Sequence, residues 1–220
     1  MTANREDYLK MIYELGGYEN QVSNKKIAEG LQISAASVSE MLQKLYREGD
    51  IEYTPYKGIQ LTEHGANKAS SLLRKHRLWE VFLVQQLQFS WSDVDEVAEL
   101  LEHVTSSELA ERLERYLQYP SVCPHGAPIP YQGSHVHDKD LKELRTLRIG
   151  ESAVIQRVVD EKELLDYLNH LQLTVGDQVT VVSIEPYEGP IILQAKGKEF
   201  QISQKAAANI YVGEQQETLV

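Results

Sequence analysis

Residues 24–45 read NKKIAEGLQISAASVSEMLQKL, and this stretch decides the fold of the N-terminal part of the chain. Asn24 is the predicted N-cap of a short helix, KKIAEGLQ, which ends before Ile33. A polar Ser-Ala-Ala-Ser entry then begins a longer helix that ends at Gly49. One face of this second helix carries the apolar residues Val38, Met41, Leu42 and Leu45. Two helices joined by such a tight turn predict a helix-turn-helix.

The flanking segments extend this motif to a winged helix-turn-helix. Before it, apolar residues at helical spacing predict a helix that stops at Gly16-Gly17. After it, IEYTPYKGIQLT at 51–62 gives two β-prone runs around a Pro-Tyr-Lys-Gly turn, which is a hairpin. Ala28 supplies the small side chain where the two helices cross.

The rest of the chain divides into a helical part and a β-rich part. From about residue 62, one long amphipathic helix and two shorter ones follow, a pattern that favours dimerisation. Residues 120–148 form a loop rich in Pro, Gly and His, and from Ile149 short strands broken by turns predict a small SH3-like β-barrel. The fold class is therefore mainly α with a β domain. We expect domains at 1–72, 73–140 and 141–220.

The charge is uneven along the 220 residues, whose formal net charge is -11. Residues 1–75 carry 10 Lys and Arg against 10 Asp and Glu, so the acidic excess lies after them. Nucleic acid thus stays open as a partner of the N-terminal domain. A single cysteine, no N-terminal apolar segment and no run of about 18 apolar residues predict a soluble, cytoplasmic protein without a membrane partner.

Two adjacent predicted helices each carry histidine and carboxylate at helical spacing. Glu99, Glu102 and His103 lie on one face of their helix, and His76 and Glu80 are spaced i, i+4 on the preceding one. A solvated helix surface explains each pair alone. Together they predict a site for a divalent cation with nitrogen and oxygen ligands.

Two further groups are candidates with an alternative explanation. Asp7 is acidic in the first turn of its helix, where a carboxylate also complements the helix dipole. Cys123 and His125 stand in SVCPHGAPIP at 121–130, where Pro124 restricts the turn. They offer a thiolate and an imidazole, but two ligands are too few for a closed site. A rigid turn or a redox-active thiol stays open.

These motifs, in this order, resemble the diphtheria toxin repressor family. The resemblance rests on REDYLKMIY, the helix-turn-helix, LTEHG, RKHRLWE, ELLEHV and CPHGAPIP, and it covers almost the whole chain. It is strongest to the manganese-sensing branch that has a C-terminal FeoA-type SH3-like domain. The resemblance implies a homodimeric, metal-dependent transcriptional repressor that binds palindromic operators and controls metal-uptake genes.

The resemblance also implies two metal sites. The first would use Asp7, Glu99, Glu102, His103 and, close by, His76; the second would use Glu80, Cys123, His125 and Asp160. Oxygen ligands suit Mn(II), with Fe(II), Zn(II), Co(II) and Cd(II) as substitutes. Lys10 stands where two-metal relatives have glutamate, so we expect two separate single-metal sites.

The predicted recognition helix and wing supply the candidate DNA contacts. Short polar side chains at the start of the helix would reach bases, and lysines would meet phosphates. The candidates are Ser34, Ala36, Ser37, Ser39, Glu40, Gln43, Lys25, Lys26, Tyr56 and Lys57. Glu40 would accept a hydrogen bond from a cytosine amino group but is repelled by phosphate.

Two other functions compete with the metal-dependent repressor. A winged-helix regulator that responds to an organic ligand or to oxidation of Cys123 would leave the acidic and histidine face merely solvated. A metal hydrolase would use the same ligands to activate water. Because no nucleophile or substrate motif accompanies them, and because the helix-turn-helix would have no role, we expect no enzymatic activity.

Overall fold

The computed structural model describes residues 4–54, 57–131 and 141–214. The chain forms two compact units. The first consists of Met1–His76, Leu101–Ser106 and Ile129–Val136; the second consists of Arg77–Leu100, Ser107–Pro128 and His137–Val220. In the described residues, no helix combines the length and the apolar character needed to cross a bilayer.

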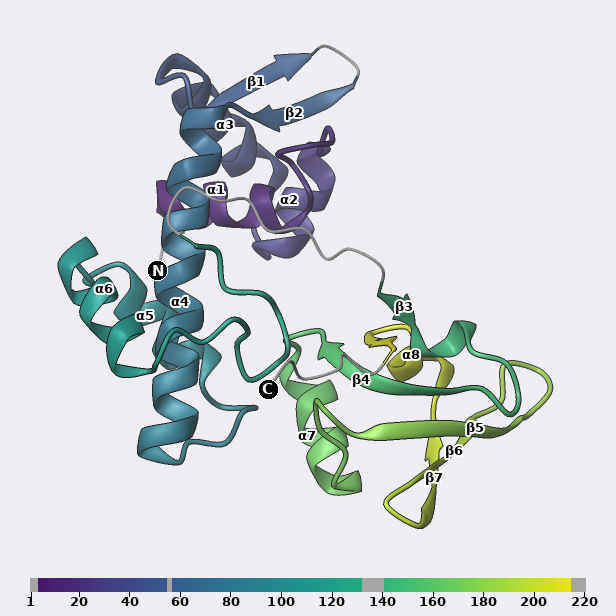
Figure 1. Cartoon of the computed structure of the whole chain (residues 1–220). Helices are drawn as coiled ribbons and strands as arrows, with labels where there is room; N and C mark the ends of the chain where they lie inside the picture. Colours follow the sequence, from purple (N-terminus) through teal and green to yellow (C-terminus); the bar gives the residue numbers. More distant parts are fainter. Residues whose placement is uncertain (1–3, 55–56, 132–140, 215–220) are drawn as a thin grey trace. The chain divides into compact units, whose positions relative to one another are not determined.

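The first unit contains the predicted winged helix-turn-helix (Figure 1). Its elements are α1 (Arg5–Glu14), α2 (Asn24–Gly30), α3 (Ala35–Arg47), β1 (Ile51–Thr54), β2 (Gly58–Leu61) and the start of α4 (Glu63–Leu87). The strands pair antiparallel with Ile51 opposite Leu61. Fully buried Ile12, Ile27 and Leu45 tie the three helices into one core, as the apolar stripes predict.

Local capping chemistry sets the ends of these helices. Ser23, not the predicted Asn24, is the N-cap of α2, because its backbone is extended and its hydroxyl accepts a hydrogen bond from the Lys26 N–H at 3.3 Å. Ser34 caps α3 in the same way through the Ser37 N–H. Thr62 accepts from the Gly65 N–H at 3.1 Å at the start of α4. The recognition helix therefore starts at a fixed residue.

The second unit contains two short helices and the β-rich part of the chain. The helices are α5 (Asp95–Glu102), whose last two residues belong to the first unit, and α6 (Ser107–Tyr116). The β-rich part comprises β3 (Lys142–Glu143), the 3-10 turn η1 (Leu144–Thr146), β4 (Ser152–Val158), α7 (Lys162–Leu171), β5 (Gln178–Ile184), β6 (Ile191–Ala195), β7 (Lys198–Ile202), α8 (Gln204–Ala207) and β8 (Ile210–Gly213).

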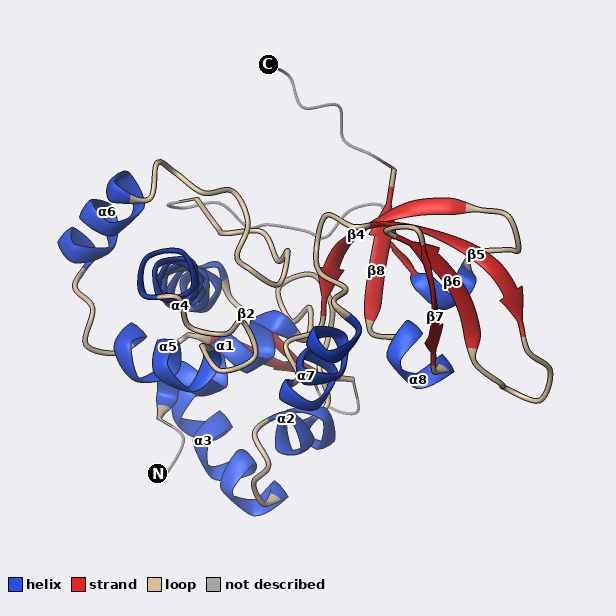
Figure 2. Cartoon of the chain, turned by 90° about the horizontal axis from the view of Figure 1, so that it is seen from below, coloured by secondary structure: helices blue, strands red, loops and turns tan. Residues whose placement is uncertain are grey.

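The six strands form one antiparallel sheet in the order β3-β8-β4-β5-β6-β7. Figure 2 shows this strongly bent sheet in red, with α7 and α8 as its helices. Register shifts in β4, between Ile155 and Arg157, and in β5, between Val181 and Ser183, accompany the bending. Leu165 and Leu168 of α7 are buried in the sheet's core. The predicted SH3-like architecture is confirmed.

Candidate metal centres

The first cluster lies where α1, α4 and the end of α5 meet in the first unit. Asp7 comes from the first turn of α1, His76 from α4 and Glu102 from the last residue of α5, and His103 follows directly. The Nε2 atom of His103 lies 3.0 Å from Oδ1 of Asp7 and 3.6 Å from Oε1 of Glu102. The Nδ1 atom of His76 lies 2.6 Å from Oε2 of Glu102. Four of the predicted residues are therefore neighbours.

Asp7 has a structural role at the start of α1 and also faces the cluster. Its Oδ2 atom accepts the backbone N–H of Asn4 at 2.7 Å, and Asn4 caps α1 in return, which completes a capping box. Its Oδ1 atom faces His103. The helix cap thus holds one oxygen in place while the other is directed into the cluster.

The other candidate ligands of the first cluster differ in how deeply they are buried. The side chain of Glu102 is fully buried, and that of His76 is 7% exposed. Glu99 stands three residues before Glu102 on α5, which puts it on the same face of that helix, and it is half-buried. Carboxylate oxygens with one or two imidazoles form a donor set that suits Mn(II) and Fe(II).

Two residues of this cluster lie outside the predicted set. Glu6 holds His103 from the other side, with Oε2 at 2.7 Å from Nδ1. Lys10 brings its ammonium to within 2.9 Å of both Glu102 oxygens. Neither contact follows from the sequence, because the partners are 97 and 92 residues apart along the chain and no local spacing pairs them.

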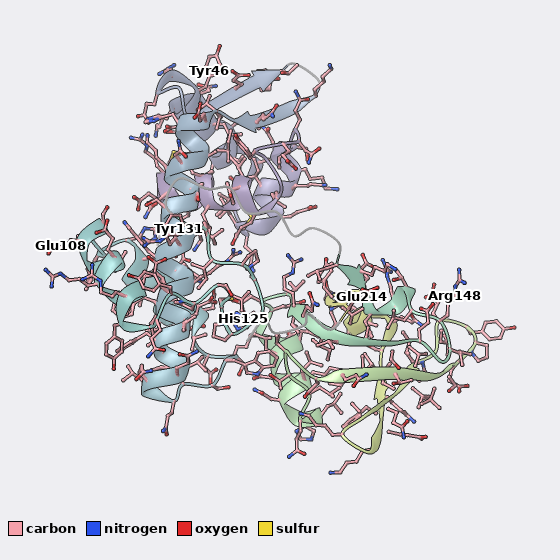
Figure 3. The ribbon with its side chains drawn as sticks, viewed as in Figure 1. Tyr46, Glu108, His125, Tyr131, Arg148 and Glu214 are labelled. Carbon is pink, nitrogen blue, oxygen red and sulfur yellow. The ribbon has the colours of Figure 1, made fainter. Side chains whose placement is uncertain are left out.

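The second cluster is built on the Cys-Pro-His-Gly turn of the second unit. Figure 3 labels His125 in the loop that follows α6. The turn closes through the Gly126 N–H to the Cys123 carbonyl and the Cys123 N–H to the Ala127 carbonyl, both at 2.9 Å. The Val158 N–H then donates to the His125 carbonyl at 2.9 Å, which ties the turn to β4.

Three potential ligands surround Nδ1 of His125. Oε1 of Glu80 lies 3.1 Å away, Oδ2 of Asp160 3.4 Å away and Sγ of Cys123 3.9 Å away. Glu80, Cys123 and His125 are buried, whereas the side chain of Asp160, two residues after β4, is 31% exposed. All four residues predicted for the second site are therefore brought together.

Trp91 fixes the orientation of the His125 ring. Its backbone carbonyl lies 2.7 Å from Nε2, and since a carbonyl only accepts, Nε2 carries the proton. The two rings also stack, with centroids 5.9 Å apart. Nδ1 is thereby directed toward the carboxylates and the thiol, in the way that a hydrogen bond to one ring nitrogen orients a metal-binding histidine.

The surroundings shift the proton affinity of both residues of the turn. Burial acts to lower the pKa of His125, but the hydrogen bonds with Cys123 and Glu80 and the charges of Glu80 and Asp160 outweigh it and raise the pKa to about 11. Burial, and then the charge of Glu80, raise the pKa of the Cys123 thiol. A buried, protonated thiol is a poor redox sensor, which weighs against the oxidation hypothesis.

Comparison with known proteins agrees with this arrangement. Three domain families match in order: Iron dependent repressor, N-terminal DNA binding domain (1–59), Iron dependent repressor, metal binding and dimerisation domain (62–131), and FeoA domain (142–214). The structure of the manganese regulator SloR is 38% identical, with a TM-score of 0.82, and the match covers 98% of this chain and all of that one. The chain belongs to the diphtheria toxin repressor family.

Two more relatives support the assignment of this chain to the family. The diphtheria toxin repressor of Corynebacterium diphtheriae is 29% identical over 222 residues, which span 95% of this chain and 96% of that protein. A manganese-dependent transcriptional repressor in complex with manganese has a TM-score of 0.88 and 29% identity, over 96% of this chain and all of the other. Proteins of this family are metal-dependent repressors and not enzymes, which confirms the predicted class.

The repressor presents its predicted DNA contacts on the surface of the first unit. The exposed candidates are Ser34, Ala36, Ser37, Ser39, Glu40, Gln43, Lys25, Lys26 and Lys57, whereas Tyr56 lies outside the described residues. Some of them already have local partners. The Ser34 hydroxyl caps α3, the Ser39 hydroxyl donates to the Ala35 carbonyl at 2.9 Å, and Glu40 accepts from Lys44 at 2.9 Å.

Proposed function

We propose that this repressor is a cytoplasmic homodimer that Mn(II) activates to bind a palindromic operator, with metal-uptake genes as its targets. We also propose that the DNA-binding domain ends at residue 72 and that the helical domain ends at residue 140, where the β-rich domain begins. The observation that carries it is the first cluster, where Asp7 of α1 meets His103 at the end of α5 at 3.0 Å. Since α1 packs in the core of the winged helix, a cation at this point would act on the element that supports the recognition helix.

The first site would be formed by Asp7, Glu99, Glu102 and His103, with His76 beside them. A bound divalent cation supplies positive charge where several carboxylates converge. The chain's own part is to hold these groups in place: Asn4 fixes Asp7 through the capping box, and Glu6 fixes the His103 ring. Mn(II) is the proposed metal because the donors are mainly oxygen.

The second site would be formed by Glu80, Cys123, His125 and Asp160. Its thiolate would make it more tolerant of softer ions such as Zn(II) or Cd(II) than the first site. Asp160 and the backbone of Val158 belong to the β-rich part of the chain, and Glu80 belongs to α4. We propose that metal here locks the β-rich domain to the helical one and adds to activation without being its sole cause.

The proposed homodimer is supported by apolar side chains that α5 and α6 leave exposed. Leu100 is 57% exposed, Leu109 43% and Tyr116 62%. Large exposed apolar side chains that gather on neighbouring helices are typical of an association surface. In a dimer, two recognition helices held about 34 to 36 Å apart would enter successive major grooves of a palindrome.

The deciding experiment measures metal-dependent DNA binding. An operator is selected from random duplex DNA with Mn(II) present, and its affinity is then titrated with Mn(II), Fe(II), Zn(II) and EDTA. We expect tight binding only with metal. Glu102→Gln should abolish the response, whereas Glu108→Gln, which alters an exposed glutamate paired with Arg112, should leave it intact. Equal affinity in EDTA and in Mn(II) would refute the metal switch.

A further inference from the structure

Lys10 is a buried cation inside the first cluster. The residue is 8% exposed, and its Nζ atom lies 2.9 Å from Oε1 and 2.9 Å from Oε2 of Glu102. The same ammonium lies 3.5 Å from Nδ1 of His76. A lysine is rarely buried to this degree unless it is paired, so the contact with Glu102 determines where the side chain lies.

Glu102 needs such a partner when no metal is bound. Its side chain is fully buried, and a buried carboxylate without a counter-charge is strongly unfavourable. The Lys10 ammonium engages both carboxylate oxygens, and His76 approaches Oε2 at 2.6 Å. In the second cluster, the counter-charge of the buried Glu80 carboxylate is the protonated His125 ring, which faces it at 3.1 Å. In the first cluster the counter-charge is a side chain that is not itself a metal ligand, because an ammonium has no lone pair.

We propose that Lys10 is an internal cation that stabilises the metal-free repressor and must release Glu102 before Glu102 can bind a metal ion. This inference rests on the proposed metal switch. Activation then exchanges one cation for another at a single carboxylate. The ammonium lowers the affinity of the first site and so raises the metal concentration at which the repressor responds. Lys10 and Asp7 are three residues apart on α1, so the helix that supplies one metal ligand also supplies the competitor for another.

The test replaces the ammonium by a neutral side chain of similar length. Lys10→Met is compared with the parent protein, both in a Cys123→Ala background that weakens the second site, and Mn(II) affinity is measured from the electron paramagnetic resonance signal of free Mn(II). We expect Lys10→Met to bind Mn(II) at least about tenfold more tightly and to melt at a lower temperature without metal. Lys10→Arg, which keeps the charge, should stay close to the parent affinity.

Lys68→Met is the matched control. Lys68 also neutralises a fully buried carboxylate, with Nζ at 2.7 Å from Oδ1 of Asp50, but Asp50 is not part of the cluster. This variant should lose thermal stability equally with and without Mn(II) and keep the parent affinity. Equal or weaker Mn(II) binding by Lys10→Met would overturn the proposal.

A second measurement applies if Lys10→Met does not fold without metal. Folding restored by Mn(II) supports the proposal, and a protein that stays unfolded in Mn(II) overturns it, because Lys10 would then be needed in both states. These outcomes are distinct from failure of the metal switch itself. In that case the parent protein would bind its operator regardless of Mn(II), whatever residue 10 is.

Discussion

The two carboxylate oxygens of Asp7 contact different parts of the first unit, the N-terminus of α1 and the ring of His103. One oxygen accepts the Asn4 N–H at 2.7 Å, and the other lies 3.0 Å from Nε2 of His103. The start of α1 is thus linked to the residue that follows α5. Because the cap already fixes the carboxylate, a bound metal would gain a ligand that has little conformational entropy left to lose.

Because the two oxygens have different partners, the charge of Asp7 and its role in the capping box can be tested separately. Asp7→Asn keeps an oxygen that can accept the Asn4 N–H but removes the negative charge. We expect its melting temperature without metal to stay near that of the wild type, while Mn(II)-dependent operator affinity falls to the metal-free level. Asp7→Ala should lose both, with up to about 1 kcal/mol less stability, because it removes the reciprocal half of the capping box while Asn4 stays as the N-cap. Fluorescence anisotropy and thermal melting measure the two effects; normal activation of Asp7→Asn would contradict the role of the charge.

The two clusters should contribute unequally to activation. Cys123→Ala removes one donor from a site that contains no residue of the winged helix, whereas Asp7→Ala alters α1 directly. We therefore expect Cys123→Ala to retain part of its Mn(II)-dependent DNA binding and Asp7→Ala to retain none. Titrations of operator affinity against Mn(II) measure the difference. Equal and complete loss in both variants would show that the division of roles is mistaken.

Metal binding at the second cluster should release protons. The pKa of His125 is raised to about 11 in the metal-free fold, so its proton stabilises that fold below the unfolded value of 6.5 and this contribution is lost as the pH approaches 11. The pKa of Cys123 is also raised, so both groups are protonated near neutral pH. A metal bound to an imidazole and a thiolate displaces both protons.

Zn(II) affinity at this cluster should accordingly rise with pH between about pH 6.5 and about pH 8.5, by up to roughly a hundredfold per pH unit for two protons. Calorimetry in buffers of different ionisation enthalpy counts the released protons, in a Glu102→Gln background that weakens the first site. Cys123→Ala should release one proton fewer. Affinity that is independent of pH would show that these side chains are not ligands.

The helices and the two ligand clusters were predictable to the extent that their signals are local. The helix-turn-helix follows from stripes and caps within 24–45, and Cys123 and His125 are two residues apart on one turn. Even the cap of α2 was wrong by one residue, because Ser23 and Asn24 are both good N-caps and only the backbone angles decide between them.

The contacts that control charge in the clusters were not predictable. The sequence shows Lys10 only as the residue that stands where two-metal relatives have glutamate. Its pairing with Glu102 arises only when α1 packs beside the end of α5 in the first unit. The carbonyl of Trp91 orients His125 through its backbone, so the identity of residue 91 carries no signal for that hydrogen bond. Asp160 follows only from the resemblance to the family, because Glu161 and Glu163 beside it are carboxylates too and the sequence alone does not choose among the three.

Substitution of a base-contacting residue and of a phosphate-contacting residue should affect DNA binding in different ways. Gln43 is exposed on α3, and Lys26 is exposed on α2. Gln43→Ala should cost about 1 to 3 kcal/mol on the selected operator and relax the preference at one base position. Lys26→Ala should weaken binding to all sequences alike and reduce the slope of log affinity against log salt by about 1. Salt titrations on the operator and on a scrambled duplex distinguish the two, and a base-specific effect of Lys26→Ala would reverse the assignment.

The second cluster depends on a glycine that no other residue can replace. Gly126 has a φ of +83°, and a Cβ atom there would lie 1.8 Å from the carbonyl oxygen of Gln156 in β4. Gly150 has nearly the same φ, +84°, but no atom lies within 4 Å of its added Cβ.

Gly150→Ala should therefore show only the cost of a left-handed residue, about 1 to 2 kcal/mol. Gly126→Ala must also displace the turn from β4, so we expect a larger loss of stability and at least about tenfold weaker Zn(II) binding at the second cluster. Chemical denaturation and Zn(II) titration of both variants measure these effects, and equal losses in the two would mean that the turn does not need its close approach to β4.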